Sequence, residues 1–367
     1  MWQLEMNMNR KYYEALYAYF KENQEEELLS LTYLEGKRAG EKYLVKASET
    51  GEELKAAEGA EIAEIEGIEG SQGIQGVITG IKETSCGRVF AERICRAPVC
   101  VICGAGHVGL AMIRLAAFAG FEVIVVEDRP VFADQARRSG AHRVICDSFE
   151  QGLARIPGGR QVFFVVMTRG HRYDKDCLIE ILKKPYAYAG MMASRGRAAR
   201  MREHLRELGV EEAKTEALHT PIGLSIHAKT PEEIAISILA EMIEVKNRDG
   251  IGASCDREIL EQIAKKEEKE PWALATIIRR AGSAPRDVGT KMLIKADGMT
   301  VGSIGGGCME AEVIQAARLF LGKSDAVKIV TADMSRADAE NEGMVCGGQI
   351  EVLLLSLIHI SEPTRPY

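Results

Sequence analysis

The segment spanning residues 99–128 constrains the fold of this chain more than any other. The apolar stretch VCVIC at 99–103 runs into the turn GAGHVG at 104–109, and a helix-like apolar run then leads to VIVVED at 123–128. A buried strand, a glycine turn, a helix and a second strand ending in acid follow the spacing of a dinucleotide-binding βαβ unit. The segment therefore predicts an α/β fold with a Rossmann-like, doubly wound parallel sheet.

Each glycine of the turn has an expected task. Gly104 permits the tight turn, Gly106 lets the backbone approach a phosphate, and Gly109 lets the helix pack against the strand. The start of the helix, next to His107, then offers N–H groups and a positive dipole end to an anion. Since a fold does not establish binding, a glycine turn without a ligand remains the alternative interpretation.

Polar residues follow two further apolar strands. The strand QVFFVVM opens directly into a TRGH loop, and the stretch AYAG leads into MMASR in the same way. Ligands of doubly wound sheets bind outside the carboxyl ends of the strands. These loops therefore add a set of candidate binding residues: Thr168, Arg169, His171, Ser194 and Arg195.

A second chemical signal lies near the end of the chain. Gly306 and Gly307 precede Cys308 at the expected start of a helix, where close backbone approach and nearby N–H donors would lower the pKa of the thiol. Cys346 stands before two glycines in a similar setting. For each cysteine, a functional role and simple burial remain open on environment alone.

Composition restricts the class of protein. The net charge of −7 and the pI near 5.7 argue against a protein that chiefly binds nucleic acid. We see neither a secretory signal nor an apolar run long enough to cross a membrane, so no membrane role is expected. The nine cysteines are scattered, and Cys100 and Cys103 lie along one expected buried strand. Reduced thiols in a cytoplasmic protein fit this pattern best.

Two parts of the chain resemble each other. Residues 28–36 followed by 40–47 parallel residues 274–282 followed by 289–296, and each block later reaches a Cys-Gly pair. We interpret this as a divergent internal repeat. The first copy lacks the glycine cluster and the Pro-Arg of the second, which favours a packing role for it.

The chain is accordingly divided into four parts. We expect a degenerate N-terminal block over 1–96, a Rossmann-like domain over 97–248, a second block over 249–354 and a non-native tail over 355–367. The tail matches one reading frame of a common transposase sequencing adapter. We therefore expect the natural C-terminus to be missing, and we leave the tail out of the fold.

These motifs together resemble the XdhC/CoxI family, accessory proteins for molybdenum hydroxylases such as xanthine dehydrogenase. The resemblance spans about Cys95 to Leu354. Its motifs are CGAGHVG, VVEDRP, TRGHRYD, PIGL, TPEEIAISILAE, GSAPRDVGTKM, GSIGGGCME and CGGQIEV. Family members commonly begin with the CoxI-type block and end with the Rossmann domain, so the domain order here is permuted. The implied architecture is a Rossmann-like domain flanked by smaller α+β XdhC/CoxI-type blocks.

The resemblance implies a protein that binds molybdenum cofactor, protects it during exchange of an oxo ligand for sulfide, and delivers it. The implied partners are the apoenzyme of a molybdenum hydroxylase and a cysteine desulfurase, and a homodimer is compatible with it. It favours a cofactor-binding chaperone over a catalyst.

The resemblance also implies roles for individual residues. The glycine turn takes the pterin phosphate or a nucleotide, and the loops after the strands line the same crevice, with Asp128 and Arg129 among them. Arg286 and the turn before Cys308 form an opposing wall, with Cys308 or Cys346 near the metal or its sulfur donor. Thiolates suit a Mo–S centre, and arginine pairs with phosphate in a fork.

Two other classes of function remain. In an NAD(P)-dependent oxidoreductase, the same Rossmann half would use Glu127 and Asp128 to hold a ribose and His171 as acid and base. A scaffold that binds only proteins would explain the degenerate first copy. It would leave the two glycine-rich turns unexplained.

Overall fold

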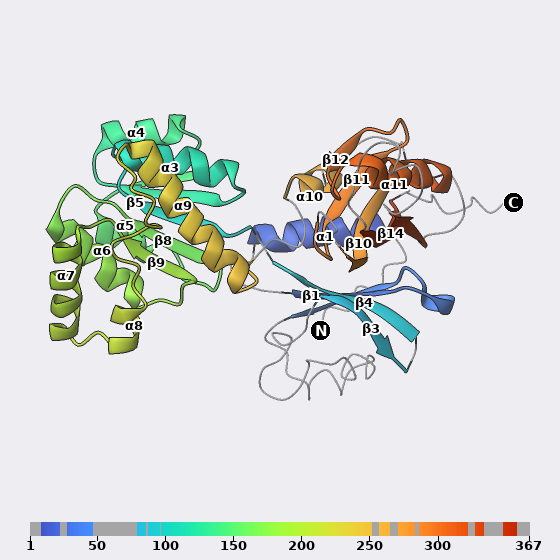
Figure 1. The fold of residues 1–367 in the computed structure, drawn as a ribbon, viewed down its shortest axis with the longest axis horizontal. Coiled ribbons are helices and arrows are strands. Elements are labelled where there is room, and N and C mark those ends of the chain that lie inside the picture. The colour runs from blue at the N-terminus through green and yellow to red at the C-terminus, as the bar shows by residue number, and fades with distance from the viewer. Residues whose placement is uncertain are drawn as a thin grey trace, which may run out of the picture. The chain divides into compact units, whose positions relative to one another are not determined.

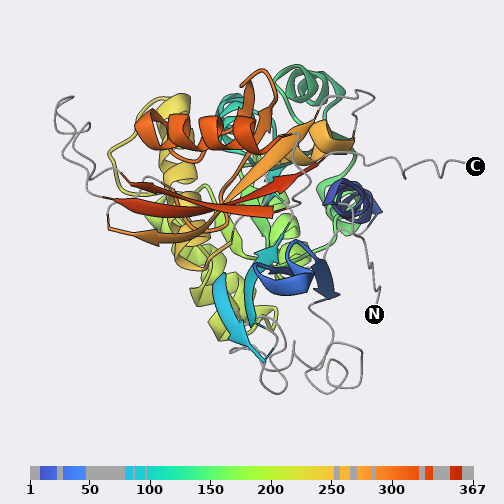
Figure 2. The same cartoon turned by 90° about the vertical axis from the view of Figure 1, so that its right-hand side faces the viewer.

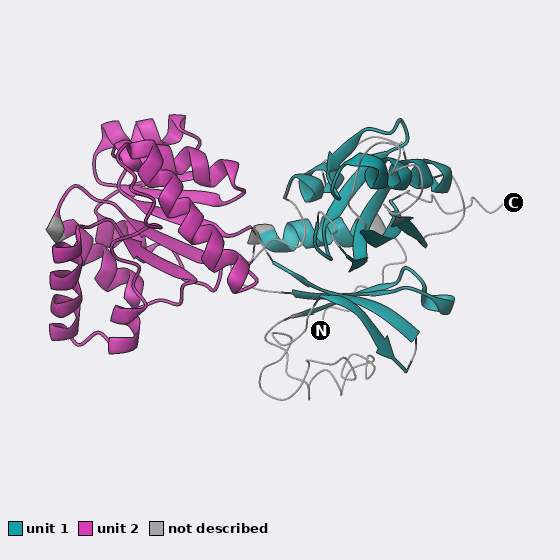
Figure 3. Ribbon diagram, in the orientation of Figure 1, with its two compact units in different colours: residues 1–96, 253–367 teal, residues 97–252 magenta. Residues whose placement is uncertain are grey.

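The computed structural model describes most of the chain and divides it into two compact units. Unit 1 joins Met1–Arg96 to Ala253–Tyr367, and unit 2 is Ala97–Gly252 (Figure 3). The described residues are 9–22, 28–46, 79–85, 87–95, 97–251, 257–264, 271–282, 286–321, 327–333 and 348–357.

Unit 2 contains the predicted parallel sheet. Its strands are β5 (Val99–Cys103), β6 (Glu122–Glu127), β7 (Arg143–Cys146), β8 (Val162–Val166) and β9 (Tyr188–Met191). They lie in the order β7-β6-β5-β8-β9, and every neighbouring pair is parallel. The order reverses at β5, which places the crevice of a doubly wound sheet at the carboxyl end of that strand. The predicted fold class is confirmed.

Helices cover both faces of this sheet (Figure 1). Side chains of α3 (His107–Phe118), α4 (Pro130–Arg138) and α9 (Pro231–Arg248) share one apolar core with the sheet. Side chains of α5 (Phe149–Ala154), α6 (His171–Leu182) and α7 (Arg195–Glu207) share the other, and the short α8 (Glu212–Glu216) follows α7. Because both faces are buried, the central strands are continuously apolar, as in VFFVV of β8.

Two cysteines of β5 show how the faces alternate. Cys100 belongs to the core beneath α3 and α9, whereas Cys103 belongs to the core beneath α5 and α6. Both are fully buried, as expected for small apolar side chains. Their side chains therefore lie on opposite faces of the sheet, an arrangement that prevents them from sharing a metal ion.

Unit 1 contains two antiparallel sheets. The first consists of β1 (Leu28–Tyr33), β2 (Lys42–Lys46), β3 (Gly80–Thr84) and β4 (Gly87–Ile94), in the order β2-β1-β4-β3. The second consists of β10 (Trp272–Ala281), β11 (Lys291–Lys295), β12 (Thr300–Gly302), β13 (Val327–Asp333) and β14 (Gln349–Ser356), in the order β12-β11-β10-β14-β13. A short 3-10 turn, η1 (Gly36–Arg38), separates β1 from β2.

The two sheets of unit 1 share one apolar core. Side chains of both sheets meet there with those of α1 (Asn9–Glu22) and α10 (Arg257–Ala264). The opposite face of the second sheet packs against α11 (Gly307–Phe320). Figures 1 and 2 show α11 and the first sheet on opposite sides of the second sheet.

The structure corrects the expectation for the tail. Leu355 and Ser356 complete β14 and pair with β10, and the N–H of Leu357 donates to the carbonyl of Trp272 at 2.8 Å. Leu355 and Leu357 are buried in the core. Excluding the chain from residue 355 onward was therefore wrong for these three residues, because their alternating apolar pattern continues the strand. Residues 358–367 lie outside the described part.

In the described part of the chain, no helix is both long enough and apolar enough to cross a membrane.

Candidate functional site

The glycine turn of unit 2 requires glycine at two of its three glycine positions, because a side chain there would clash with the backbone. Gly104 has φ +106°, and a Cβ there would lie 2.7 Å from the carbonyl oxygen of Met167. A Cβ at Gly109 would lie 2.2 Å from the carbonyl oxygen of Gly104. A Cβ at Gly106 would meet no atom within 4 Å. The turn is therefore tightly packed at Gly104 and Gly109, and open at Gly106, where α3 begins with the exposed His107.

The acid at the end of β6 supports this turn from within. Glu127 is fully buried, and its Oε2 accepts a 2.7 Å hydrogen bond from the N–H of Ala105. Its Oε1 accepts 2.7 Å and 3.2 Å hydrogen bonds from Nε and the backbone N–H of Arg129. Both oxygens of Glu127 thus hold the turn and the guanidinium, and the ribose contact expected of an oxidoreductase stays a prediction. Arg129 is committed to the same contact.

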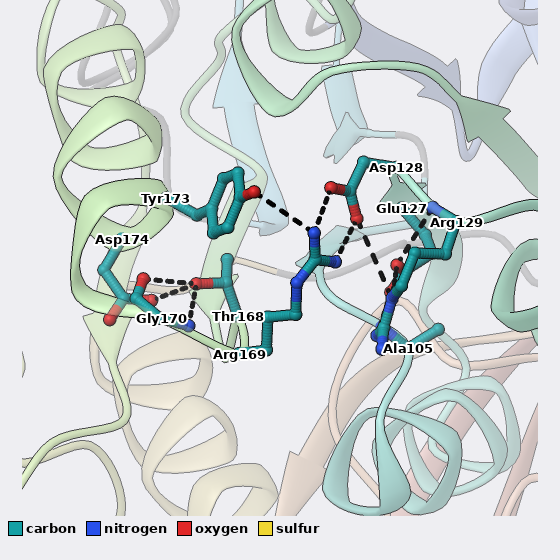
Figure 4. A network of polar contacts seen from close by, with 9 residues as sticks. All are labelled: Ala105, Glu127, Asp128, Arg129, Thr168, Arg169, Gly170, Tyr173 and Asp174. Atoms are coloured by element: carbon teal, nitrogen blue, oxygen red, sulfur yellow. Dashed lines mark hydrogen bonds and ion pairs between the residues drawn. The ribbon is translucent and has the colours of Figure 1, made fainter.

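A second ion pair joins the ends of β6 and β8. Arg169 donates from both terminal nitrogens to Asp128, over 2.6 Å and 2.8 Å, and from one of them to the Tyr173 hydroxyl over 3.2 Å. Figure 4 shows the guanidinium of Arg169 between Asp128 and Tyr173. Partial burial opposes ionisation of Asp128, but the hydrogen bonds and the positive charge of Arg169, together with hydrogen bonds to Glu127 and to the backbone, lower the pKa of this carboxyl.

The loop after β8 is fixed by a buried carboxylate. The Thr168 hydroxyl donates to Asp174 Oδ1 at 2.5 Å, and Arg197 of α7 pairs with the other oxygen of Asp174. Asp174 is buried and lies in the first turn of α6, which begins at His171. The side chain of His171 lies outside the described part. These contacts tie the ends of β8, α6 and α7 together.

The predicted residues of unit 2 gather at one edge of its sheet. Those placed at the carboxyl ends of the strands, or in the helix starts that follow, are Gly104, Gly106, His107, Gly109, Asp128, Arg129, Thr168, Arg169, His171, Ser194 and Arg195. Ser194 and Arg195 are exposed where α7 begins. The edge therefore offers two partly or fully exposed guanidinium groups, Arg169 and Arg195, to an anion.

A further polar cluster was missed by the sequence reasoning. Glu241 of α9 accepts hydrogen bonds from the Tyr188 hydroxyl and from the N–H of Gly223 at 2.9 Å, and lies 3.1 Å from Nδ1 of His219. Burial opposes ionisation of Glu241, yet the hydrogen bonds from His219 and Tyr188 lower its pKa. The cluster joins β9, α9 and the segment between them.

In unit 1, the glycine turn before α11 is also open. Gly305, Gly306 and Gly307 have φ values of +134°, +73° and +65°, and a Cβ at Gly306 or Gly307 would meet no atom within 4 Å. Such backbone strongly favours glycine. Cys308 is exposed in the first turn of α11, and Arg286 is exposed in the loop before β11. Cys346 lies outside the described part.

Two backbone N–H groups of this turn bind a carboxylate, whereas the sequence led us to expect N–H donors near the Cys308 thiol. Glu310 Oε2 accepts from the N–H groups of Ile304 at 3.2 Å and Gly306 at 3.0 Å, and from the Ser303 hydroxyl at 2.7 Å. These two N–H groups therefore stabilise a carboxylate one turn along the helix rather than a thiolate at Cys308. The sequence contained the signal, since an acid in the first turn of a helix commonly binds the N–H groups there.

The geometry defines the class of protein: a Rossmann domain combined with a unit of two antiparallel sheets, each part with an open glycine turn at the start of a helix. Residues 100–242 match the XdhC Rossmann domain, and residues 266–333 match the XdhC and CoxI family. The chain belongs to the XdhC/CoxI family.

Two curated proteins are similar to part of the chain. The chain is 34% identical over 151 residues to the uncharacterized protein YqeB of Escherichia coli K12, covering 41% of this chain and 28% of that protein. It is 29% identical over 160 residues to a probable xanthine dehydrogenase subunit of Bacillus subtilis 168, covering 44% of this chain and 46% of that protein. Each match thus spans less than half the length of the curated relative.

A solved structure supports the fold. The crystal structure of a xanthine dehydrogenase from Bacillus halodurans superposes with a TM-score of 0.50 at 22% identity, covering 70% of this chain and 69% of that chain. The identity is low, so the superposition bears on the fold alone.

Proposed function

We propose that this protein is an accessory factor that binds molybdenum cofactor and assists its sulfuration and its insertion into a hydroxylase of the xanthine dehydrogenase type. The observation that carries the proposal is that both family segments present an open glycine turn at the start of a helix, one beside arginines and one beside a thiol. Backbone can approach a ligand closely at Gly106, Gly306 and Gly307, where a Cβ would meet no atom within 4 Å.

The turn of unit 2 fits the phosphate end of the cofactor. The first N–H groups of α3 have no partner within the helix, and the helix dipole favours an anion there. Arg169 is 39% exposed and can direct its two-pronged guanidinium toward phosphate oxygens. Arg195 is exposed at the start of α7 on the same edge of the sheet. These residues would bind and orient the phosphate.

The turn of unit 1 offers a different chemistry, that of a thiol. Cys308 is exposed, and a thiolate is the side chain best suited to a soft metal–sulfur centre. When bound, the cofactor supplies the molybdenum at which an oxo ligand is exchanged for sulfide. Cys308 would lie beside the metal or its sulfur donor, a role in which a cysteine desulfurase is the expected source of sulfur.

The test is to co-express the chain with a xanthine dehydrogenase-type apoenzyme and measure three quantities. These are the molybdenum and pterin retained by the purified accessory protein, and the activity of the hydroxylase. We expect retained pterin and molybdenum in about equal amounts, and an active hydroxylase. Cys308→Ser should retain the pterin yet reduce the activity, because the thiol is absent while the phosphate site is intact.

Cys146→Ser is the matched control, since Cys146 is also exposed but ends β7 in unit 2. It should leave retention and activation unchanged. Loss of activation in both variants, or in neither, would remove the role assigned to Cys308. Steady turnover of NADH without retained pterin would instead support an oxidoreductase and end the proposal.

A further inference from the structure

The Asp128–Arg169 ion pair links the two strand ends that flank the glycine turn. In the order β6-β5-β8, Asp128 follows β6 and Arg169 follows β8, while the turn follows the strand between them. Neighbouring strands lie about 4.8 Å apart, so the two side chains reach toward each other over two strand spacings. Figure 4 shows this bridge on the same side of the sheet as Ala105 of the turn.

The two arginines beside the turn differ in how firmly they are held. Arg129 donates to the buried Glu127, and its guanidinium lies 3.6 Å from the ring centroid of Phe132. Arg169 is held by Asp128 and by Tyr173. The side chains of Arg129 and Arg169 are similarly exposed, at 34% and 39%, but Glu127 is fully buried whereas the side chain of Asp128 is 19% exposed. Turning Arg169 therefore costs less than turning Arg129, because it leaves no fully buried carboxylate without its partner.

A phosphate at the turn would change the balance of charge. It would approach the carboxylate of Asp128, which repels it, unless Arg169 turns from Asp128 to the phosphate. After that exchange Asp128 keeps Arg129 Nε at 3.8 Å, and its oxygens can accept hydrogen bonds from hydroxyl groups. A ligand that carries both a phosphate and neighbouring hydroxyls can bind both separated side chains: its phosphate accepts from Arg169, and its hydroxyls donate to Asp128.

We propose that Asp128 and Arg169 form a latch, which a phosphate ester opens by taking Arg169 while its hydroxyl groups take Asp128. The ligand class is a nucleotide or a similar hydroxylated phosphate ester. This inference rests on the proposed function, because it concerns the same glycine turn. A phosphate without hydroxyls binds only while the latch is open. Its apparent affinity therefore equals its intrinsic affinity multiplied by the fraction of time that the latch is open.

Calorimetric titration tests the latch with two probes, sodium pyrophosphate and ADP, in buffer without divalent cations. Asp128→Asn should bind pyrophosphate about tenfold more tightly than the unmodified protein, since a latch closed about nine-tenths of the time is removed. Arg169→Gln should weaken binding of both probes at least tenfold. The unmodified protein should prefer ADP to pyrophosphate, and Asp128→Asn should lose that preference.

Asp134→Asn is the matched control, because Asp134 pairs with Arg137 on the exposed face of α4. It removes the same charge and should leave both affinities within about twofold, which separates the latch from a change in net charge. Thermal melts confirm that each variant is folded. Pyrophosphate affinity that is unchanged or weaker in Asp128→Asn, or no binding of either probe to any variant, overturns the latch.

The titration and the co-expression experiment fail independently. Absence of retained molybdenum would overturn the proposed function, yet it would leave a tenfold gain in Asp128→Asn intact. Retained cofactor together with an unchanged pyrophosphate affinity would overturn the latch alone.

Discussion

The two halves of unit 1 are built on one plan. Each begins with a helix, α1 or α10, and each forms an antiparallel sheet in which the strands have equivalent order: β2-β1-β4-β3 in the first and β11-β10-β14-β13 in the second. The register also agrees, because Thr32 pairs with Lys42 and Thr276 pairs with Lys291.

The halves differ in the sequence between their second and third strands. In the second half this stretch carries β12, the open glycine turn and α11, with Cys308 in its first turn. The sequence between β2 and β3 of the first half, residues 47–79, contains no cysteine and no run of three glycines. The shared strands therefore supply the frame, and the glycine turn and the thiol of the candidate site belong to the sequence of the second half.

The paired lysines have different contacts in the described residues. Lys42 donates to Thr32 Oγ1 at 2.7 Å, and its ammonium lies 5.1 Å and 5.3 Å from the ring centroids of Tyr12 and Tyr13 of α1. Lys291 instead pairs with Glu92 of the other sheet and donates to the carbonyl of Gly289 at 3.2 Å. Lys291 and Glu92 are almost fully buried. Lys291 thus joins the two sheets, whereas Lys42 donates to the neighbouring strand and lies against the aromatic rings of α1.

The largest effect is expected from breaking the pair between the sheets. Lys291→Met leaves Glu92 as a buried charge without its partner, which should cost about 3–5 kcal/mol of unfolding free energy. Urea denaturation followed by the fluorescence of the buried Trp272 measures the loss in this unit. A loss below about 1 kcal/mol would show that the pair does not join the sheets energetically.

The double variant Lys291→Met with Glu92→Leu is the control. Replacing both charges by apolar side chains of similar size should recover most of the loss, because an apolar pair in a core is often no worse than a buried ion pair. A double variant as unstable as the single one would assign the loss to packing rather than to the unpaired carboxylate.

The parts of the fold that follow from local rules could be predicted from the sequence. The glycine turn and the apolar parallel strands both appear where the sequence placed them. Each depends on residues within one or two turns of one another. The internal repeat could also be recognised from the sequence. Its first strand was aligned with an error of two residues, because residue 28 was matched with residue 274. The register aligns Ser30 with Leu274, and β10 has a bulge between Ile277 and Arg279.

Contacts between distant residues could not be predicted. The cluster of His219 and Glu241 joins residues 22 positions apart through a loop, and Lys291 meets Glu92 across almost 200 residues. Glu127 looked like a ribose ligand because acids at that position often are. Its actual partner, the N–H of Ala105, depends on how closely the turn packs on β6.

A smaller effect is expected near the glycine turn of the second half, and it separates steric clash from backbone strain. Gly302 has φ +79°, and a Cβ there would lie 2.9 Å from the carbonyl oxygen of Lys291 and 3.0 Å from Ile259 Cδ1. Gly302→Ala should cost about 2–3 kcal/mol, because strain and overlap add. Gly306→Ala meets open space, and strain alone should cost about 1 kcal/mol. Equal losses in urea denaturation would contradict the open turn.

The smallest change in stability is expected from substituting the two equivalent threonines, Thr32 and Thr276. Thr32 and Thr276 are both buried, but only the Thr32 hydroxyl accepts from a lysine; among the described residues the Thr276 hydroxyl has no hydrogen-bond partner. Thr32→Val should cost about 1–2 kcal/mol, since it removes an acceptor from the buried ammonium of Lys42. Thr276→Val should change stability by less than about 0.5 kcal/mol, or increase it, since it removes a buried hydroxyl without a partner. The two substitutions have the same shape, so their difference in urea midpoint measures the divergence of the lysines. Equal losses at both positions would mean that Lys42 and Lys291 still play the same role.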